Sequence, residues 1–273
     1  MCGRYVMARA TSDLVALGDA ETNEELVLRQ SWNVAPTAEV PILVAHADDV
    51  GAGVTRRIHV ARWGLVPPWA KELSVGSRAF NARSETVASK PTFRAAVRAR
   101  RCAVPVEGYY EWKTPEPGAK GPDGRAAKKQ PYYVHPAGAG DGEGPVIWFA
   151  GLYEWWQDPE AKAAGEDAWV LSTTILTMAA PDADDDDPVL AALGQLHDRL
   201  PVPMDAETMD RWLTPDTLGS AEEADALVGQ VCARAYDVAA GWSLRPVEGA
   251  VGNVRNNGPE LIQEMREQQG TLL

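Results

Sequence analysis

The sequence predicts an α+β fold, a strand-rich mixed sheet that is curved or barrel-like and carries a few peripheral helices. Short apolar runs are interrupted by Pro and Gly, and few segments have the 3.6-residue period of a helix. The expected strands and helices do not alternate regularly, which disfavours a doubly wound parallel sheet. With 273 residues, 45% of them hydrophobic, the chain is long enough to bury a large core.

Seven segments have the apolar, β-branched or aromatic composition of strands, and four carry helix signals. The expected strands are residues 3–7, 40–45, 57–63, 102–106, 132–135, 146–152 and 169–177. The expected helices, each marked by a cap residue or an N-terminal proline, are 11–17, 91–100, 205–213 and 221–233. The chain has no internal repeat.

These elements fit one domain over residues 1–248. Gly, Pro, Ala and Asp are concentrated in three expected loop insertions, near residues 113–130, 136–145 and 180–188. Residues 249–273 lack a strong core pattern, apart from a helix-like stretch at 259–268, and form an expected flexible C-terminal tail.

Composition excludes several classes of protein. Neither a signal peptide nor about 18 consecutive apolar residues for a membrane span is present, so we expect a cytoplasmic protein. Cys2, Cys102 and Cys232 are odd in number and widely separated, which disfavours both a disulfide framework and a zinc site. We expect a monomer without cofactor or metal.

Charge is unevenly distributed. The formal net charge is −13, but residues 78–101 contain seven basic residues and one acid, Glu85, a local balance of 7 − 1 = +6. Five aspartates lie elsewhere, between Asp182 and Asp187. The basic segment is consistent with a local anion-binding face, and equally with a solvated helix whose arginines alternate with apolar residues.

Cys2 has a distinctive position, because removal of Met1 by a methionine aminopeptidase would make it a 1,2-aminothiol. The amine can form a Schiff base with an aldehyde, and the thiol can close that adduct into a thiazolidine ring. An α-amine titrates at about 7.7–8 and a thiol at about 8.5, so a positive neighbour such as Arg4 would activate both. The alternative is that a short second residue merely favours methionine removal.

Four clusters combine Trp or Tyr with Pro, Asn, Arg or Glu: residues 32–37, 62–70, 80–86 and 108–112. Exposed aromatic rings beside arginine suit stacking on unpaired bases and contact with phosphates. Core packing is the alternative, and we expect it for most of the 10 tryptophans.

In order along the chain, these motifs resemble the SRAP family, the SOS response-associated peptidase-like proteins that shield abasic sites in single-stranded DNA. The eight matching motifs span residues 2–213: Cys2-Gly3-Arg4-Tyr5, WNVAPT, WGLVPPW, NARSET, the basic run from Lys90 to Cys102, GYYEW, FAGLYE and HDRLP. One departure is Leu200, where the family usually has Met, a swap of similar volume.

The resemblance implies a reaction and roles for named residues. Cys2 would form a thiazolidine crosslink with the ring-opened abasic sugar, Asn81 would position the sugar and the amine, and Glu111 would transfer protons. His197 would promote sugar opening or shuttle protons. The implied contacts to single-stranded DNA come from these residues: Arg4, Arg83, Arg94, Arg199, Trp69 and Trp112. Such a protein would be nucleoid-associated when bound to DNA.

Alternatives remain for the activity and for single residues. Cys2 could be the N-terminal nucleophile of a thiol peptidase that processes Met1 itself, or the groove could bind single-stranded DNA without covalent chemistry. A lyase side activity could follow from the Schiff base. Asn81 could be a turn residue, and Glu111 could pair with Arg83 or Arg4. His46, His59 and His135 lack a motif and are expected to be structural.

Overall fold

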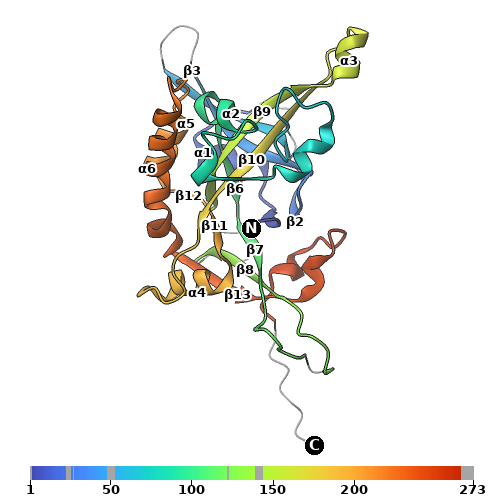
Figure 1. The fold of residues 1–273 in the computed structure, drawn as a ribbon, viewed down its shortest axis with the longest axis vertical. Helices are drawn as coiled ribbons and strands as arrows, with labels where there is room; N and C mark the ends of the chain where they lie inside the picture. Colours follow the sequence, from blue (N-terminus) through green and yellow to red (C-terminus); the bar gives the residue numbers. More distant parts are fainter. Residues whose placement is uncertain are drawn as a thin grey trace, which may run out of the picture.

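The computed structural model describes residues 2–22, 26, 28–47, 53–121, 123–138 and 144–265, and it contains two sheets. Five strands of the larger sheet pair in the order β10-β4-β3-β6-β9, and β9 pairs back with β10, which closes a barrel. The smaller sheet has the order β13-β8-β7-β1-β2. Figure 1 shows the segment that leads into β1 near the centre of the molecule, between the barrel above and the smaller sheet below. This is the α+β, barrel-like fold that the sequence predicts.

The barrel strands are β3 (Glu39–Ala47), β4 (Val54–Trp63), β6 (Arg101–Val106), β9 (Ile147–Gln157) and β10 (Trp169–Ala179), joined at their edges by β5 (Asn81–Arg83), β11 (Arg199–Pro201) and β12 (Pro203–Met204). The smaller sheet consists of β1 (Tyr5–Met7), β2 (Ser31–Val34), β7 (Gly108–Lys113), β8 (Gln130–Pro136) and β13 (Trp242–Pro246). The helices are α1 (Thr11–Gly18), α2 (Arg94–Ala99), α3 (Pro159–Ala164), α4 (Pro188–Leu196), α5 (Ala206–Leu213) and α6 (Ala221–Ala239). Four short 3-10 helices are η1 (Leu73–Arg78), η2 (Ser84–Thr86), η3 (Gly249–Gly252) and η4 (Pro259–Ile262).

The seven expected strands and the four expected helices inside the domain are present. The prediction missed β2, β5, β7, β11, β12 and β13, as well as α3 and α4. The expected loop at 113–130 connects β7 to β8, and part of the one at 136–145 lies outside the described residues. The acidic loop at 180–188 leads into α4, where the Asp187 carboxylate accepts the N–H groups of Val189 and Leu190.

The strand β10 tolerates the adjacent polar residues Ser172 and Thr173 in the barrel because both of their hydroxyls have hydrogen-bond partners. Thr173 Oγ1 donates to the Leu152 carbonyl at 2.9 Å, and Ser172 Oγ donates to the Glu154 carbonyl at 3.2 Å. Ser172 Oγ also accepts the Val66 N–H at 2.9 Å. A buried hydroxyl is costly only when it lacks such a partner, so these residues fix the register of β9 and β10.

Gly64 and Gly76 bring the segment after β4 against η1. Gly64 has a φ of 131°, in the region that favours glycine, and a Cβ there would lie 2.4 Å from the Gly76 carbonyl oxygen. A Cβ on Gly76 would lie 2.3 Å from the Gly64 carbonyl oxygen. The two glycines therefore allow η1 to lie close to the barrel.

The expected flexible tail is wrong for residues 249–265, whereas 266–273 lie outside the described residues. Val251, Leu261 and Ile262 are buried in a cluster with Val6, Tyr110, Tyr133 and Val247. The expected helix at 259–268 is observed only as the short helix η4. The buried Asn33 amide holds this segment, because its Nδ2 donates to the carbonyls of Val251, Asn253 and Asn256 at 3.2, 3.0 and 3.0 Å.

We expect Asn33→Ala to destabilise the fold by roughly 2 kcal/mol or more, since it leaves three carbonyls without their shared donor. Urea unfolding measures this loss, and limited proteolysis should show earlier cleavage after residue 249. Asn253→Ala is the control, because its backbone carbonyl remains in place. Equal stability of the two variants would contradict this role of Asn33.

Candidate functional site

Asn81, at the start of β5, contacts the N-terminal segment directly. β5 runs parallel to β10, with Ile175 opposite Asn81, so a barrel strand fixes its position. The Asn81 Nδ2 donates to the Cys2 carbonyl at 2.8 Å. Its Oδ1 is buried and has no hydrogen-bond partner among the described residues. Asn81 therefore orients the Cys2 backbone and keeps one acceptor for another group.

The Cys2 side chain is fully buried, and burial raises the pKa of its thiol well above the ordinary range. The Glu111 carboxylate raises the pKa further, while a hydrogen bond from the Arg4 backbone lowers it. The sequence prediction that Arg4 would activate this thiol is therefore wrong, because desolvation outweighs the positive neighbour. The Arg4 guanidinium instead donates to the Gly3 carbonyl at 3.0 Å. Met1, whose removal was predicted, lies outside the described residues.

Glu111 and His197 lie on the same side of this site. Glu111, on β7, is 5% exposed, and its Oε1 lies 3.9 Å from His197 Nε2. His197 follows the last residue of α4, and its Nδ1 lies 3.0 Å from the Arg199 backbone N–H and 2.7 Å from Asp198 Oδ1. Glu111 thus lies within ion-pair distance of His197.

Arg199 is engaged within the protein. Its guanidinium donates to both carboxylate oxygens of Glu85, at 2.6 and 3.0 Å, and to the Thr177 carbonyl at 2.7 Å. This contact joins the strand that follows His197 to the segment that follows Asn81. The sequence analysis did not foresee the pair, and a phosphate contact by Arg199 stays a prediction that requires displacement of Glu85.

The Glu85 and Arg199 pair predicts a pH effect on stability. Hydrogen bonding to Arg199 is the main cause that lowers the pKa of Glu85. A lowered pKa stabilises the fold above the ordinary carboxyl pKa of about 4.3, and this stabilisation is lost as pH falls through the folded value. Glu85→Gln should therefore unfold more easily than wild type at pH 7, with a difference that shrinks below pH 4. A difference between the urea midpoints of wild type and Glu85→Gln that does not change with pH would contradict this prediction.

The basic segment is divided between structural and accessible residues. Arg101 is 5% exposed and donates to the carbonyls of Trp212, Val97 and Arg98, while Arg98 and Arg100 bind Leu218 and Glu154. The remaining four are Arg78, Arg83, Lys90 and Arg94. All four are exposed, and none has an ion pair within the described part of the chain. Only part of the expected anion-binding face is therefore available.

The two predicted groove tryptophans differ. Trp69 is 60% exposed in the Pro-Pro bend, whereas Trp112 is half-buried against the cluster that includes Tyr110. Five of the ten tryptophans are buried, so the expectation that most of them pack in the core is confirmed only in part; the five are Trp63, Trp148, Trp156, Trp212 and Trp242. The indole N–H groups of Trp63, Trp156 and Trp212 donate to backbone carbonyls.

Sequence reasoning missed two phenols beside Cys2. Tyr5 and Tyr109 pair across β1 and β7, both are buried, and burial together with Cys2 raises the pKa of each hydroxyl. The Tyr5 hydroxyl has no hydrogen-bond partner among the described residues. The sequence contained a signal that could have placed Tyr109 at the site, because Tyr109 and Glu111 are two residues apart and share one face of a strand.

With this geometry established, comparison with known proteins identifies the family. Residues 1–254 match the SOS response associated peptidase (SRAP) family. The chain belongs to the SRAP family. A relative, YoqW of Bacillus subtilis, is named an abasic site processing protein and is 30% identical over 264 residues, which cover 96% of this chain and 99% of YoqW. HMCES of Rattus norvegicus carries the same description and is 27% identical over 258 residues, 85% of this chain and 64% of HMCES.

Solved structures share the SRAP fold seen here. A crystal structure of a protein from Bacteroides thetaiotaomicron superposes with a TM-score of 0.69 at 20% identity and covers 97% of this chain and all of the other. A second, from Bordetella bronchiseptica, has a TM-score of 0.58 at 22% identity and covers 90% of this chain and all of the other. Within the described residues, no helix combines the length and apolar character of a membrane span.

Proposed function

We propose that this protein processes abasic sites in single-stranded DNA by forming a covalent thiazolidine crosslink through Cys2 after Met1 is removed. The single observation that supports the proposal is the hydrogen bond from Asn81 Nδ2 to the Cys2 carbonyl, at a site where the Glu111 carboxylate is close enough to raise the pKa of the Cys2 thiol. The names of the relatives support the same substrate. We further propose that it acts as a cytoplasmic monomer, associated with the nucleoid when bound to DNA.

The reaction balances without a cofactor. The ring-opened abasic sugar presents an aldehyde at C1′, and the Cys2 α-amine adds to it and loses water to form an imine. The thiol then adds across the C=N bond, so that sulfur bonds to C1′ and the thiol proton moves to nitrogen. Only water leaves, and C1′ carries both a C–N and a C–S bond.

Each neighbour of Cys2 has a role in this proposal. The burial that raises the thiol pKa keeps Cys2 protonated at neutral pH, so thiol addition needs a group that accepts its proton. Glu111 is the proposed acceptor and His197 the proposed proton shuttle and promoter of sugar opening. Asn81 would position the amine through the Cys2 carbonyl, and its buried Oδ1 would accept a hydrogen bond from the sugar.

Accessible cations would bind the DNA backbone around this centre. Arg83 and Arg94 are exposed, and Trp69 offers an indole face for an unpaired base. Arg4, Trp112 and Arg199 are less exposed and would need local rearrangement to reach the DNA.

The test is attachment that survives denaturation. Met1-processed protein is incubated with single-stranded DNA carrying one abasic site, or with the same DNA intact, and run on a denaturing gel. A shifted band only with abasic DNA supports the proposal. Binding in a native gel without a shifted band would indicate a noncovalent binder, and release of product from peptide or ester substrates without DNA attachment would indicate a thiol hydrolase.

A lyase side activity belongs to the same proposal. The imine can undergo β-elimination and nick the strand, with Glu111 as the proposed base. Cys2→Ala should retain borohydride-trappable imine formation, because its amine is unchanged. Absence of both trapping and nicking would exclude this side activity.

A further inference from the structure

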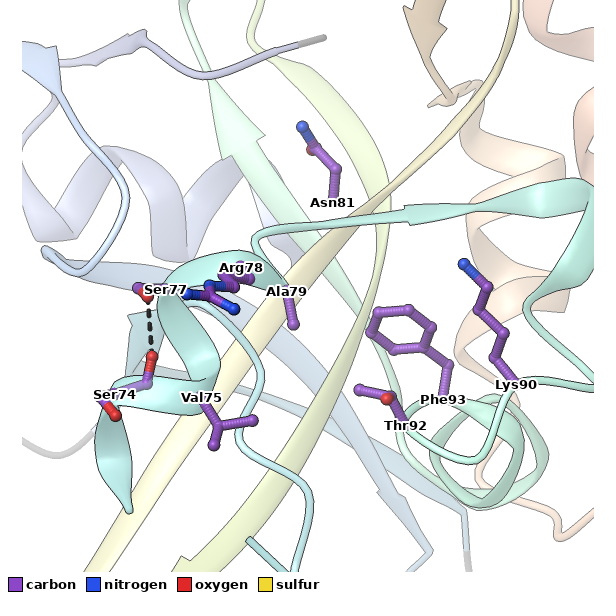
Figure 2. Close-up of a pocket in the computed structure, with 9 residues that line it drawn as sticks. All are labelled: Ser74, Val75, Ser77, Arg78, Ala79, Asn81, Lys90, Thr92 and Phe93. Carbon is purple, nitrogen blue, oxygen red and sulfur yellow. Dashed lines mark hydrogen bonds between the residues drawn. The ribbon is translucent and has the colours of Figure 1, made fainter.

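A pocket of about 530 Å³ opens at Asn81, and its other lining residues have no role assigned above. Nine residues line it, and we name it the Phe93 pocket: Ser74, Val75, Ser77, Arg78, Ala79, Asn81, Lys90, Thr92 and Phe93. They come from η1, from the start of β5 and from the turn before α2 (Figure 2). This volume lies within the range of pockets that hold small molecules or parts of larger ligands.

One side of the Phe93 pocket is apolar. Phe93 and Ala79 are 6% and 7% exposed, so the core fixes both, and Val75 is 37% exposed. Figure 2 shows the Phe93 ring directed toward Ala79, with Val75 at the base of the same space. This apolar wall, of which Val75 is the most exposed member, suits contact with a flat heteroaromatic group such as a nucleobase.

The other side is cationic. Arg78 and Lys90 are exposed, and no carboxylate is among the lining residues. Neither cation has an ion pair within the described ranges. The Ser77 hydroxyl is already engaged, because it donates to the Ser74 carbonyl at 2.7 Å. Two uncompensated cations at one rim attract a phosphate.

The Phe93 pocket is coupled to the reacting cysteine by one residue. Asn81 lines the pocket and also binds the Cys2 carbonyl through Nδ2. The pocket therefore adjoins the residue that holds the Cys2 backbone.

We propose that the Phe93 pocket binds the nucleotide next to the abasic site, with its base against the apolar wall formed by Val75 and Phe93 and its phosphate at Arg78 and Lys90. This proposal rests on the proposed function. It makes the protein a reader of the lesion's neighbour, because affinity then depends on an intact base at one adjacent position.

The phosphate contact is tested with single-stranded DNA that carries a tetrahydrofuran analogue, which lacks the aldehyde and cannot crosslink. Fluorescence anisotropy at several salt concentrations gives the slope of log K against log salt. The double variant Arg78→Gln/Lys90→Gln should lower the magnitude of that slope by about 1.4, because each neutralised phosphate of a single strand contributes about 0.7. The double variant Arg125→Gln/Lys162→Gln removes two exposed cations elsewhere and should leave it unchanged. An unchanged slope in the pocket variant would overturn the proposal.

The base contact is tested by replacing the nucleotide on either side of the analogue with a second analogue. Wild type should lose roughly fivefold or more in affinity for removal of the base on one side. Val75→Glu should abolish this difference, and its partly exposed position makes folding tolerant of the change, as its melting temperature will show. The proposal fails if neither side matters to wild type, or if Val75→Glu retains the dependence.

Two further outcomes separate this proposal from others. Free AMP should not compete at micromolar concentration, and competition would assign the pocket to free nucleotides and overturn the proposal. Because the analogue cannot crosslink, these measurements are independent of covalent chemistry. A wild type that shows base dependence but never crosslinks to abasic DNA would sink the proposed function and leave the nucleotide pocket supported.

Discussion

Cys2→Ala should abolish denaturant-resistant attachment to abasic DNA, because in the proposed reaction the thiol supplies the C–S bond that closes the ring. The amine of this variant still forms an imine, but the imine hydrolyses when the protein is denatured. The expected result is therefore a band that falls to background on a denaturing gel and returns after borohydride reduction. The measurement compares crosslink yield with and without borohydride at equal protein concentration.

Cys232→Ala is the matched control for this experiment. Cys232 lies on α6 and is only partly buried, and burial raises the pKa of its thiol as it does for Cys2. A nonspecific thiol effect would therefore reduce the yield of both variants, whereas the proposed chemistry leaves Cys232→Ala like wild type. A second control retains Met1, which turns the reacting amine into an amide and should also give no band. A borohydride-independent band from Cys2→Ala would disprove the thiazolidine.

The fold could be predicted where strands are long and apolar. β3, β9 and β10 have nearly continuous apolar or β-branched sequences, which is typical of strands buried on both faces. β7 was missed because its sequence GYYEWK starts with glycine and contains a buried acid, which interrupts the apolar pattern. The helix α4 was missed although Asp187 and Pro188 are strong start signals, since the preceding aspartates favoured a loop.

The site, like the fold, has features that the sequence predicts and features that it does not. The four predicted catalytic residues lie together in space. The order of the motifs identified them, although the sequence gives no knowledge of the distances between them. The pair of Glu85 and Arg199 was not foreseen, since the two residues are 114 positions apart and neither local spacing nor periodicity connects them. The direction of the Cys2 pKa shift was also predicted wrongly. It depends on burial by residues far away in the sequence, and a nearby arginine in the sequence does not reveal that burial.

Glu111→Gln should slow crosslinking by roughly 10²- to 10⁴-fold, the usual contribution of a positioned acid or base. The amide can keep the hydrogen bond in which the Trp112 N–H donates to Oε1 at 3.2 Å, so the strand should be undisturbed. The substitution Glu111→Gln has a second effect on the crosslinking rate, and this effect has the opposite sign. Removing the carboxylate also removes a cause that raises the pKa of the Cys2 thiol. If thiol ionisation alone limited the rate, the variant would be faster.

The sign of the rate change therefore decides which step Glu111 controls. Single-turnover crosslinking at saturating DNA measures it, and native-gel affinity should change little. Glu154→Gln is a matched control: Glu154 is equally buried, precedes a tryptophan, and accepts the Trp155 N–H at 3.1 Å, but it pairs with Arg100 on the barrel. A slow crosslinking rate for Glu111→Gln, together with a wild-type rate for Glu154→Gln, would establish proton transfer by Glu111 at Cys2. An equal or faster rate for Glu111→Gln would leave the thiol proton to His197 or to water.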